Sequence, residues 1–152
     1  MADTGPDRLF RGLEQHVANP ILRVVLRSPI HRLVSGTLVL LSYEGRQSGR
    51  RFTTPVAYER DGTDVVVTTF RDEAVWWRNF RDGHPATLWL RGEPVDATGR
   101  ASTDEAVVAD WLETLADRDS RLLSFFDVPA EGDRAAREAA AEDLVVVRFA
   151  LA

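Results

Sequence analysis

Three arginines crowd a Gly-Ser-Gly turn, and no other stretch of this sequence is better suited to bind an anion. The turn reads GRQSGRR from Gly45 onward and lies between two runs rich in β-branched and aromatic residues. Gly45 and Gly49 permit positive φ, so backbone N–H groups can converge there, and the Ser48 hydroxyl can donate to a phosphate oxygen. A solvated hairpin tip would have the same composition, so both interpretations stay open. The arginines are Arg46, Arg50 and Arg51.

The strand-like run after the turn contains a proline. Pro55 has no N–H to give to a β-ladder, so we expect it at a sheet edge, a bulge or the opening of a barrel. An edge beside a cationic turn is a place where a flat ligand can lie. A proline that marks an ordinary edge strand is the equal alternative.

Two adjacent tryptophans form the third candidate feature. On a helix, Trp76 and Trp77 would point about 100° apart, so at most one would face the core squarely. The other could cover a ligand, and Asn79 could orient a polar edge of it. The alternative is a pair of structural tryptophans.

Side chains for proton transfer are few. Tyr43, Tyr58, Ser48 and His84 are the only suggestive groups, and none has a catalytic spacing with another. We name Tyr43 and Tyr58 as candidates, and no nucleophile elbow, metal-binding His pair or P-loop occurs. If the protein is an enzyme, its chemistry belongs to a cofactor.

Composition narrows the remaining classes. The 152 residues carry a net charge of −5, no cysteine and three histidines, so thiolate chemistry is excluded and we expect no metal site. All 19 basic residues are arginine. Residues 1–60 have a net charge of +4 and residues 61–152 one of −9, which argues against nucleic-acid binding and for a compact anionic ligand.

The N-terminal region predicts the location. The first twenty residues contain Asp3, Asp7 and Glu14 and no apolar core, so we expect no signal peptide and a cytoplasmic protein. Arginines interrupt the apolar stretch that follows, which excludes a membrane span. Residues 20–35 are compatible with a peripheral helix at the inner face of a membrane, with packing against the rest of the protein as the alternative.

The order of predicted elements suggests one mainly β domain. Helical patterns cover 1–36 and 101–142, the latter opened by a capping-box spacing from Ser102 to Glu105. Strands and one helix, near residues 72–83, fill 37–100, and a closing strand occupies 143–152. The turn signal Asp61-Gly62 predicts a hairpin. About six largely antiparallel strands with peripheral helices fit a small barrel that hides its edges.

Taken together, these motifs resemble a known family. The arginine turn, Thr54-Pro55, Arg71 after a strand and Trp76-Trp77-x-Asn79 are similar to the deazaflavin (coenzyme F-420)-dependent nitroreductase and quinone reductase family. The resemblance covers roughly residues 19–92. It implies a split β-barrel, often a homodimer, that passes hydride from a reduced 8-hydroxy-5-deazaflavin to a quinone-like or nitroaromatic small-molecule acceptor.

The resemblance also implies a cofactor site. Arg46 and Ser48 match the phosphate-contacting loop, and Arg71 matches a basic position near the oligoglutamate tail of the coenzyme. The run from Thr54 to Val56 matches the strand beside the ring. The complete set of implied cofactor contacts is Arg46, Gln47, Ser48, Gly49, Arg50, Arg51, Thr54, Pro55, Val56, Arg71, Trp77 and Asn79.

The sequence departs from one member of the family at two of that member's phosphate contacts. Gln47 replaces a lysine and Phe52 replaces an arginine, so Arg50 and Arg51 would have to compensate. Related split barrels bind FMN, and a non-catalytic protein that stores cofactor is a further alternative. On the acceptor side, Phe125 and Phe126 could wall a quinone pocket or fill the core.

Overall fold

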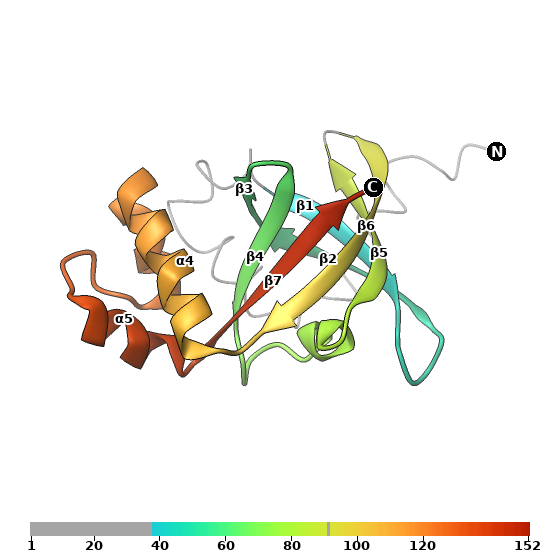
Figure 1. Cartoon of the computed structure of the whole chain (residues 1–152). Coiled ribbons are helices and arrows are strands. Elements are labelled where there is room, and N and C mark those ends of the chain that lie inside the picture. Colours follow the sequence, from blue (N-terminus) through green and yellow to red (C-terminus); the bar gives the residue numbers. More distant parts are fainter. Residues whose placement is uncertain (1–37, 91) are drawn as a thin grey trace.

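The computed structural model describes residues 38–90 and 92–152, and their strands form one curled antiparallel sheet (Figure 1). The strand order is β2-β1-β5-β6-β7-β4-β3. Cα atoms of β2 also approach within 8 Å of those of β4, so the sheet curls into an open barrel. The elements are β1 (Leu38–Glu44), β2 (Arg51–Ala57), β3 (Glu59–Asp61), β4 (Asp64–Phe70), the 3-10 helix η3 (Trp76–Phe80), β5 (His84–Leu90), β6 (Glu93–Ser102), α4 (Glu105–Arg118), the 3-10 helix η4 (Ser120–Phe126), α5 (Arg134–Ala141) and β7 (Leu144–Leu151).

One apolar cluster fills the inside of the curled sheet. Alternate residues of each strand point inward, as the period of two in a strand requires. The 3-10 helix η3 closes one end of the barrel with the fully buried Phe80, whose ring lies 5.3 Å from that of Phe149 on β7. The sheet and η3 therefore share a single core.

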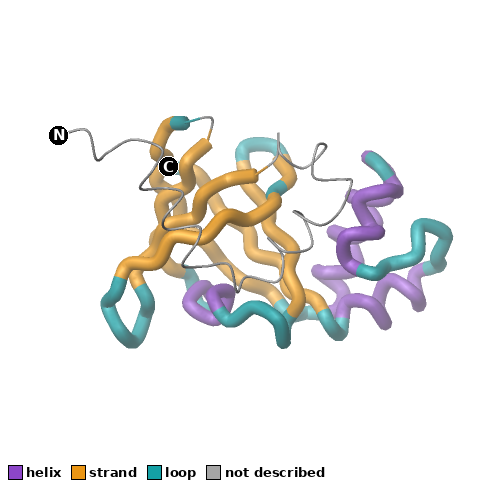
Figure 2. The backbone as a smooth tube through the Cα atoms, turned by 180° about the vertical axis from the view of Figure 1, so that it is seen from behind, coloured by secondary structure: helices purple, strands orange, loops and turns teal. Residues whose placement is uncertain are grey.

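A second apolar cluster lies on the outer face of the sheet. Helix α4 packs there against β4 and β7, with Val108, Leu112 and Leu115 buried against Val66 and other outward residues. The indole N–H of Trp111 donates to Thr68 Oγ1 at 3.0 Å, which satisfies the one polar atom of that ring. Figure 2 shows these helices gathered at one side of the molecule, away from the β1–β2 hairpin.

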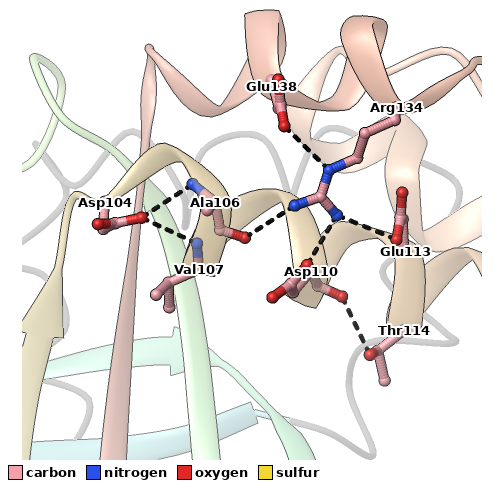
Figure 3. A network of polar contacts seen from close by, with 8 residues as sticks. All are labelled: Asp104, Ala106, Val107, Asp110, Glu113, Thr114, Arg134 and Glu138. Carbon is pink, nitrogen blue, oxygen red and sulfur yellow. Dashed lines mark hydrogen bonds and ion pairs between the residues drawn. The ribbon is translucent and has the colours of Figure 1, made fainter.

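Polar contacts fasten the two helices together (Figure 3). Arg134 of α5 pairs with Asp110 at 2.7 Å, with Glu113 at 3.1 Å and with Glu138 at 3.1 Å. These hydrogen bonds raise the pKa of the Arg134 guanidinium further above its ordinary value. A single exposed ion pair contributes little to stability, but one cation shared among three carboxylates from two helices fixes their relative orientation.

The mainly β, antiparallel fold predicted from the sequence is confirmed, with seven strands in the described residues where about six were predicted. The run 51–60 changes partner at Tyr58, because β2 pairs with β1 and β3 pairs with β4. The Asp61-Gly62 hairpin is confirmed. The helix predicted near 72–83 is a five-residue 3-10 helix.

Two further expectations need comment. Helix α4 is capped by Asp104, whose side chain accepts from the N–H groups of Ala106 and Val107, so Ser102 is not the N-cap. The hydroxyl of Ser102 instead accepts from the Asp104 N–H. The helices predicted over 1–36 and the membrane contact of 20–35 lie outside the described residues. Within the described part of the chain, no helix combines the length and apolar character needed to cross a bilayer.

We expect Gly99→Ala to destabilise the barrel. A Cβ at this position of β6 would stand 2.6 Å from ring carbons of both Phe149 and Phe80, in a core without space to yield. Overpacking of this kind costs about 1–3 kcal/mol. Urea unfolding measures the change, and Thr98→Ala on the exposed face of the same strand is the matched control. Equal stabilities of the two variants would contradict the close approach.

Candidate functional site

The arginine turn closes the β1–β2 hairpin and is held by its own backbone. The Gly45 N–H donates to the Arg50 carbonyl at 2.7 Å, and the Gly49 N–H donates to the Gly45 carbonyl at 2.8 Å. Gly49 has a φ of +67°, as the sequence allows, whereas Gly45 does not adopt a positive φ. A Cβ at Gly45 would stand 2.6 Å from Ser48 Oγ and 2.9 Å from a ring carbon of Phe52, so a side chain at this position would have to displace both.

A second element fixes the turn from outside. The Arg46 N–H donates to Asn79 Oδ1 at 2.9 Å, and Asn79 Nδ2 donates to the Trp76 carbonyl at 2.9 Å. The Arg46 guanidinium also pairs with Asp82 at 3.3 Å. The structure thus joins the hairpin turn to the segment around η3, two parts of the sequence from which cofactor contacts were predicted.

Several donors on the turn are left without a partner among the described residues. The N–H groups of Gln47 and Ser48 make no hydrogen bond within the described parts of the chain. Ser48 Oγ accepts from the Arg50 N–H at 3.2 Å, so the hydroxyl hydrogen is free to be donated. These three donors lie on exposed residues of one short turn.

The three arginines of the turn differ in their pairing. Arg51 donates to Ser42 Oγ at 2.8 Å and lies 3.8 Å from the Glu44 carboxylate, while Arg46 has Asp82. The Arg50 guanidinium lies 6.0 Å from the centre of the Phe52 ring, and no carboxylate of the described residues pairs with it. The turn therefore carries one uncompensated positive charge, at Arg50.

Two carboxylates in this arrangement were missed from the sequence. Glu44 lies directly opposite Arg51 in the hairpin register, so the predicted hairpin could have identified it. Asp82 follows η3 and reaches Arg46 only through the tertiary fold. No local sequence signal points to that pair.

Strand β2 presents less side-chain surface than the resemblance suggests. It is an edge strand, as Pro55 predicted. Val56 is fully buried in the inner cluster and Thr54 is 7% exposed. Pro55 lies on the opposite face of the strand and is buried as well. A ring lying along β2 would therefore meet the main chain rather than these side chains.

Arg71 lies at the end of β4 and is fully engaged in holding the fold together. Its guanidinium donates to the carbonyls of Leu144 at 2.8 Å, Thr103 at 2.7 Å and Ala141 at 3.0 Å. Its own carbonyl accepts from the Trp77 indole N–H at 3.2 Å. The structure thus places Arg71 among the helix and strand ends near α4, α5 and β7, and not on the arginine turn.

Both tryptophans of the pair are buried, at 7% for Trp76 and 3% for Trp77. The expectation that at most one would face the core is wrong, because the segment is a 3-10 helix that closes the barrel end rather than an α-helix on a surface. Arg78 and Arg81 flank the Trp77 ring, at 5.7 Å and 5.0 Å from its centre. The Trp76 indole N–H is buried and has no hydrogen-bond partner among residues 38–90 and 92–152.

The proton-transfer candidates do not form a catalytic group. Tyr43 is buried between Phe52 and Phe80, and desolvation raises the pKa of its phenol to about 12. Tyr58 is half-buried at the edge of the inner cluster. The Nε2 atom of His84 lies 2.6 Å from the Glu44 carbonyl. Tyr43 therefore keeps its proton at neutral pH.

Phe125 and Phe126 lie beside the helices, on η4. Their rings are 6.4 Å apart, and Phe126 packs against Phe70 and the outer cluster. This placement agrees with a core role for Phe126.

Comparison with known proteins identifies the fold. No model of a known protein family matches the chain. The FAD and heme binding protein from Mycobacterium smegmatis is similar with a TM-score of 0.51 and 15% identity, over 80% of this chain and 66% of that chain. A domain-swapped dimer is similar with a TM-score of 0.50 and 12% identity, over 78% and 91%.

A more distant likeness is to an F-420 reductase, with a TM-score of 0.42 and 15% identity over 82% of this chain and 94% of that chain. The curled antiparallel sheet, together with the likenesses to the Mycobacterium smegmatis protein and the domain-swapped dimer, shows a split β-barrel fold. Identities this low show a shared fold, and the ligand of this chain has to be argued from its own residues.

The buried phenol makes a prediction about pH. Because the folded state holds the Tyr43 proton to a higher pH than the unfolded state does, stability should be intact below pH 10 and fall as the pH rises toward 12. Absorbance titration should show one phenol ionising near pH 12, and Tyr43→Phe should remove that step. Tyr58→Phe is the control, and loss of the high step in that variant would contradict the assignment.

Arg71 should matter for stability. Arg71→Met leaves three carbonyls without their donor, and we expect a loss of about 1–3 kcal/mol in the free energy of unfolding. Arg78→Met, which removes an exposed arginine from the following helix η3, is the matched control in urea unfolding. The opposite result would be an unchanged stability of Arg71→Met together with weaker cofactor binding, the more so the longer the oligoglutamate tail. That result would show that Arg71 binds the coenzyme.

Proposed function

We propose that this protein is a deazaflavin-dependent reductase whose arginine turn holds the phosphate of the coenzyme. The observation that carries the proposal is the set of unused donors on the turn. The N–H groups of Gln47 and Ser48, the Ser48 hydroxyl and the Arg50 guanidinium all lie on exposed residues of one short turn. A phosphate diester offers one negative charge and several acceptor oxygens, which matches this set.

The departure at Phe52 fits the same interpretation. The Phe52 ring packs against Tyr43, 5.7 Å between centres, so this position has joined the core. The Arg50 guanidinium lies over the outer side of that ring. A positive charge is thus kept beside the position where one member of the family has an arginine, and it comes from the neighbouring residue on the turn.

Rigidity supports binding at this turn. Asn79 holds the Arg46 backbone, and Asp82 holds its side chain, so the turn is ordered before a ligand arrives. A preformed set of donors does not have to be organised on binding, and less affinity is lost to ordering. The role of Asn79 in this proposal is to position the turn, and it need not touch the coenzyme.

When bound, the reduced deazaflavin would supply a hydride to a quinone-like or nitroaromatic acceptor. The contribution of the chain is to hold the coenzyme by its phosphate and to set its ring along the edge of β2. Since Thr54, Pro55 and Val56 are all buried, the main chain of β2 would form that edge. Tyr43 stays protonated and is not a base at neutral pH.

FMN and a storage role are the rivals of this proposal. FMN has a terminal phosphate with more negative charge and no oligoglutamate tail, so binding of FMN would not depend on a tail. A storage protein would bind the coenzyme without turnover. A homodimer, a cytoplasmic location and a peripheral membrane contact through residues 20–35 remain part of the proposal and follow from the family resemblance and the sequence.

The test is a fluorescence titration with oxidised deazaflavin coenzyme and, in parallel, with FMN. We expect saturable deazaflavin binding that Arg50→Gln weakens about tenfold, as the loss of one charge-assisted hydrogen bond predicts. Ser48→Ala should weaken it less. Arg78→Gln is the matched control, an exposed arginine that lies outside the turn.

Each outcome has a definite meaning. Tighter FMN binding, unaffected by tail length, would replace deazaflavin with FMN. Binding that Arg50→Gln leaves unchanged would overturn the phosphate site. Binding without reduction of any quinone or nitroaromatic acceptor would favour storage over catalysis.

A further inference from the structure

A groove runs along the outer face of the barrel between helix α4 and the strands β6 and β7. Its volume is about 640 Å³. Cross-strand neighbours of β6 and β7 form its floor, and the first turns of α4 form one wall. Figures 1 and 2 both show α4 on the side of the sheet away from the β1–β2 hairpin, so the groove and the arginine turn are separate places on the molecule.

Two arginines face each other on the floor of this groove. Arg100 of β6 lies directly opposite Arg148 of β7 in the strand register. Like charges in this position repel each other and destabilise a sheet. Arg148 is neutralised by Asp61 at 2.8 Å and by Asp64 at 3.3 Å. Arg100 is exposed and has no carboxylate partner in the described parts of the chain.

The surrounding carboxylates cannot serve Arg100 because they are already occupied. Asp61 is shared between Arg148 and Arg118. Asp110, the acidic residue of α4 in the groove, binds Arg134 on its other side at 2.7 Å. Of the charged residues that line the groove, Arg100 alone has no ion pair within the described residues.

A glycine leaves room for this unpaired cation. A Cβ at Gly83 would stand 3.0 Å from a terminal nitrogen of the Arg100 guanidinium. Gly83 also has a φ of +88°, where a side chain is disfavoured. The guanidinium thus lies beside bare backbone on the β5 side of β6, on an exposed residue.

The other surfaces of the groove are apolar or carry hydroxyls. Val107 on α4 is 47% exposed, and Val146 lies on the floor. The hydroxyls of Thr98 and Ser102 flank Arg100 on the same face of β6. Ser102 Oγ accepts from the Asp104 N–H at 3.3 Å, so its hydrogen can be donated.

We propose that this groove binds a small amphipathic carboxylate. The carboxylate would pair with Arg100 and the neighbouring hydroxyls of β6, and the apolar part of the ligand would lie against Val107 and the floor at Val146. Such a ligand would neutralise the unpaired cation and cover the exposed valine at once. This site does not depend on the function of the arginine turn.

The probe is octanoate, with 1-octanol as an uncharged counterpart of the same chain length. Titration of the ¹⁵N-labelled full chain, followed by NMR, should shift amide signals of β6, β7 and the start of α4 in a saturable way. We expect Arg100→Gln to weaken octanoate binding about tenfold or more and to leave octanol unaffected. Arg78→Gln is the matched control, since it removes an exposed arginine that does not line the groove.

A second pair of variants keeps the test independent of Arg100. Val107→Glu places a negative charge at the lip of the groove, at a position of the first helical turn where an acid suits the helix, and should abolish octanoate binding. Val107→Gln, of the same shape, should retain most of it. Equal affinity for octanoate and octanol, signal shifts at the hairpin turn, or binding that neither variant weakens would overturn the proposal.

Discussion

The packing of four aromatic rings around Phe80 is the interaction on which the rest of the structure depends. The Phe80 ring is fully buried at the open end of the curled sheet and lies within 6 Å of four other rings: 5.5 Å from Tyr43, 5.9 Å from Trp76, 5.7 Å from His84 and 5.3 Å from Phe149. Edge-to-face contacts of this kind add to the burial of apolar area. Because Phe80 belongs to the short helix η3, this packing also fixes Asn79, and Asn79 in turn holds the arginine turn. The packing of the core thus also holds the arginine turn in place.

Much of the fold could be predicted from the sequence, because strands and hairpin turns are specified locally. Alternating β-branched residues and the pair Asp61-Gly62 indicate both the strands and one of their connections. The change of partner at Tyr58 could not be predicted, since a strand pattern says nothing about which neighbour each half will pair with. The 3-10 form of η3 also depends on packing against the barrel end.

The sequence predicts that the arginine turn lies at a hairpin, but it does not predict which arginine pairs with which carboxylate. Arg46, Arg50 and Arg51 look alike in the sequence, and the structure separates them by their partners: Asp82, none among the described residues, and Glu44. Arg71 shows the same limit, because its partners are carbonyls more than thirty residues away in the chain. Which arginine remains unpaired is a property of the tertiary structure. A chain whose cations are all arginines can use most of them as internal ties and leave a few free for ligands.

Pro55 has a consequence for how copies of this molecule meet one another. Among the described strands, β2 and β3 are the two edges of the sheet, and an exposed edge is a template to which a strand of another chain can add. On β2, Pro55 takes one donor out of the middle of that template. On β3, the strand is only three residues long and all three carry charged side chains. An incoming strand would meet an interrupted hydrogen-bond ladder at β2 and a short, charged strand at β3. Both edges of the open barrel therefore disfavour the addition of strands from other copies, which is the step that builds fibrils.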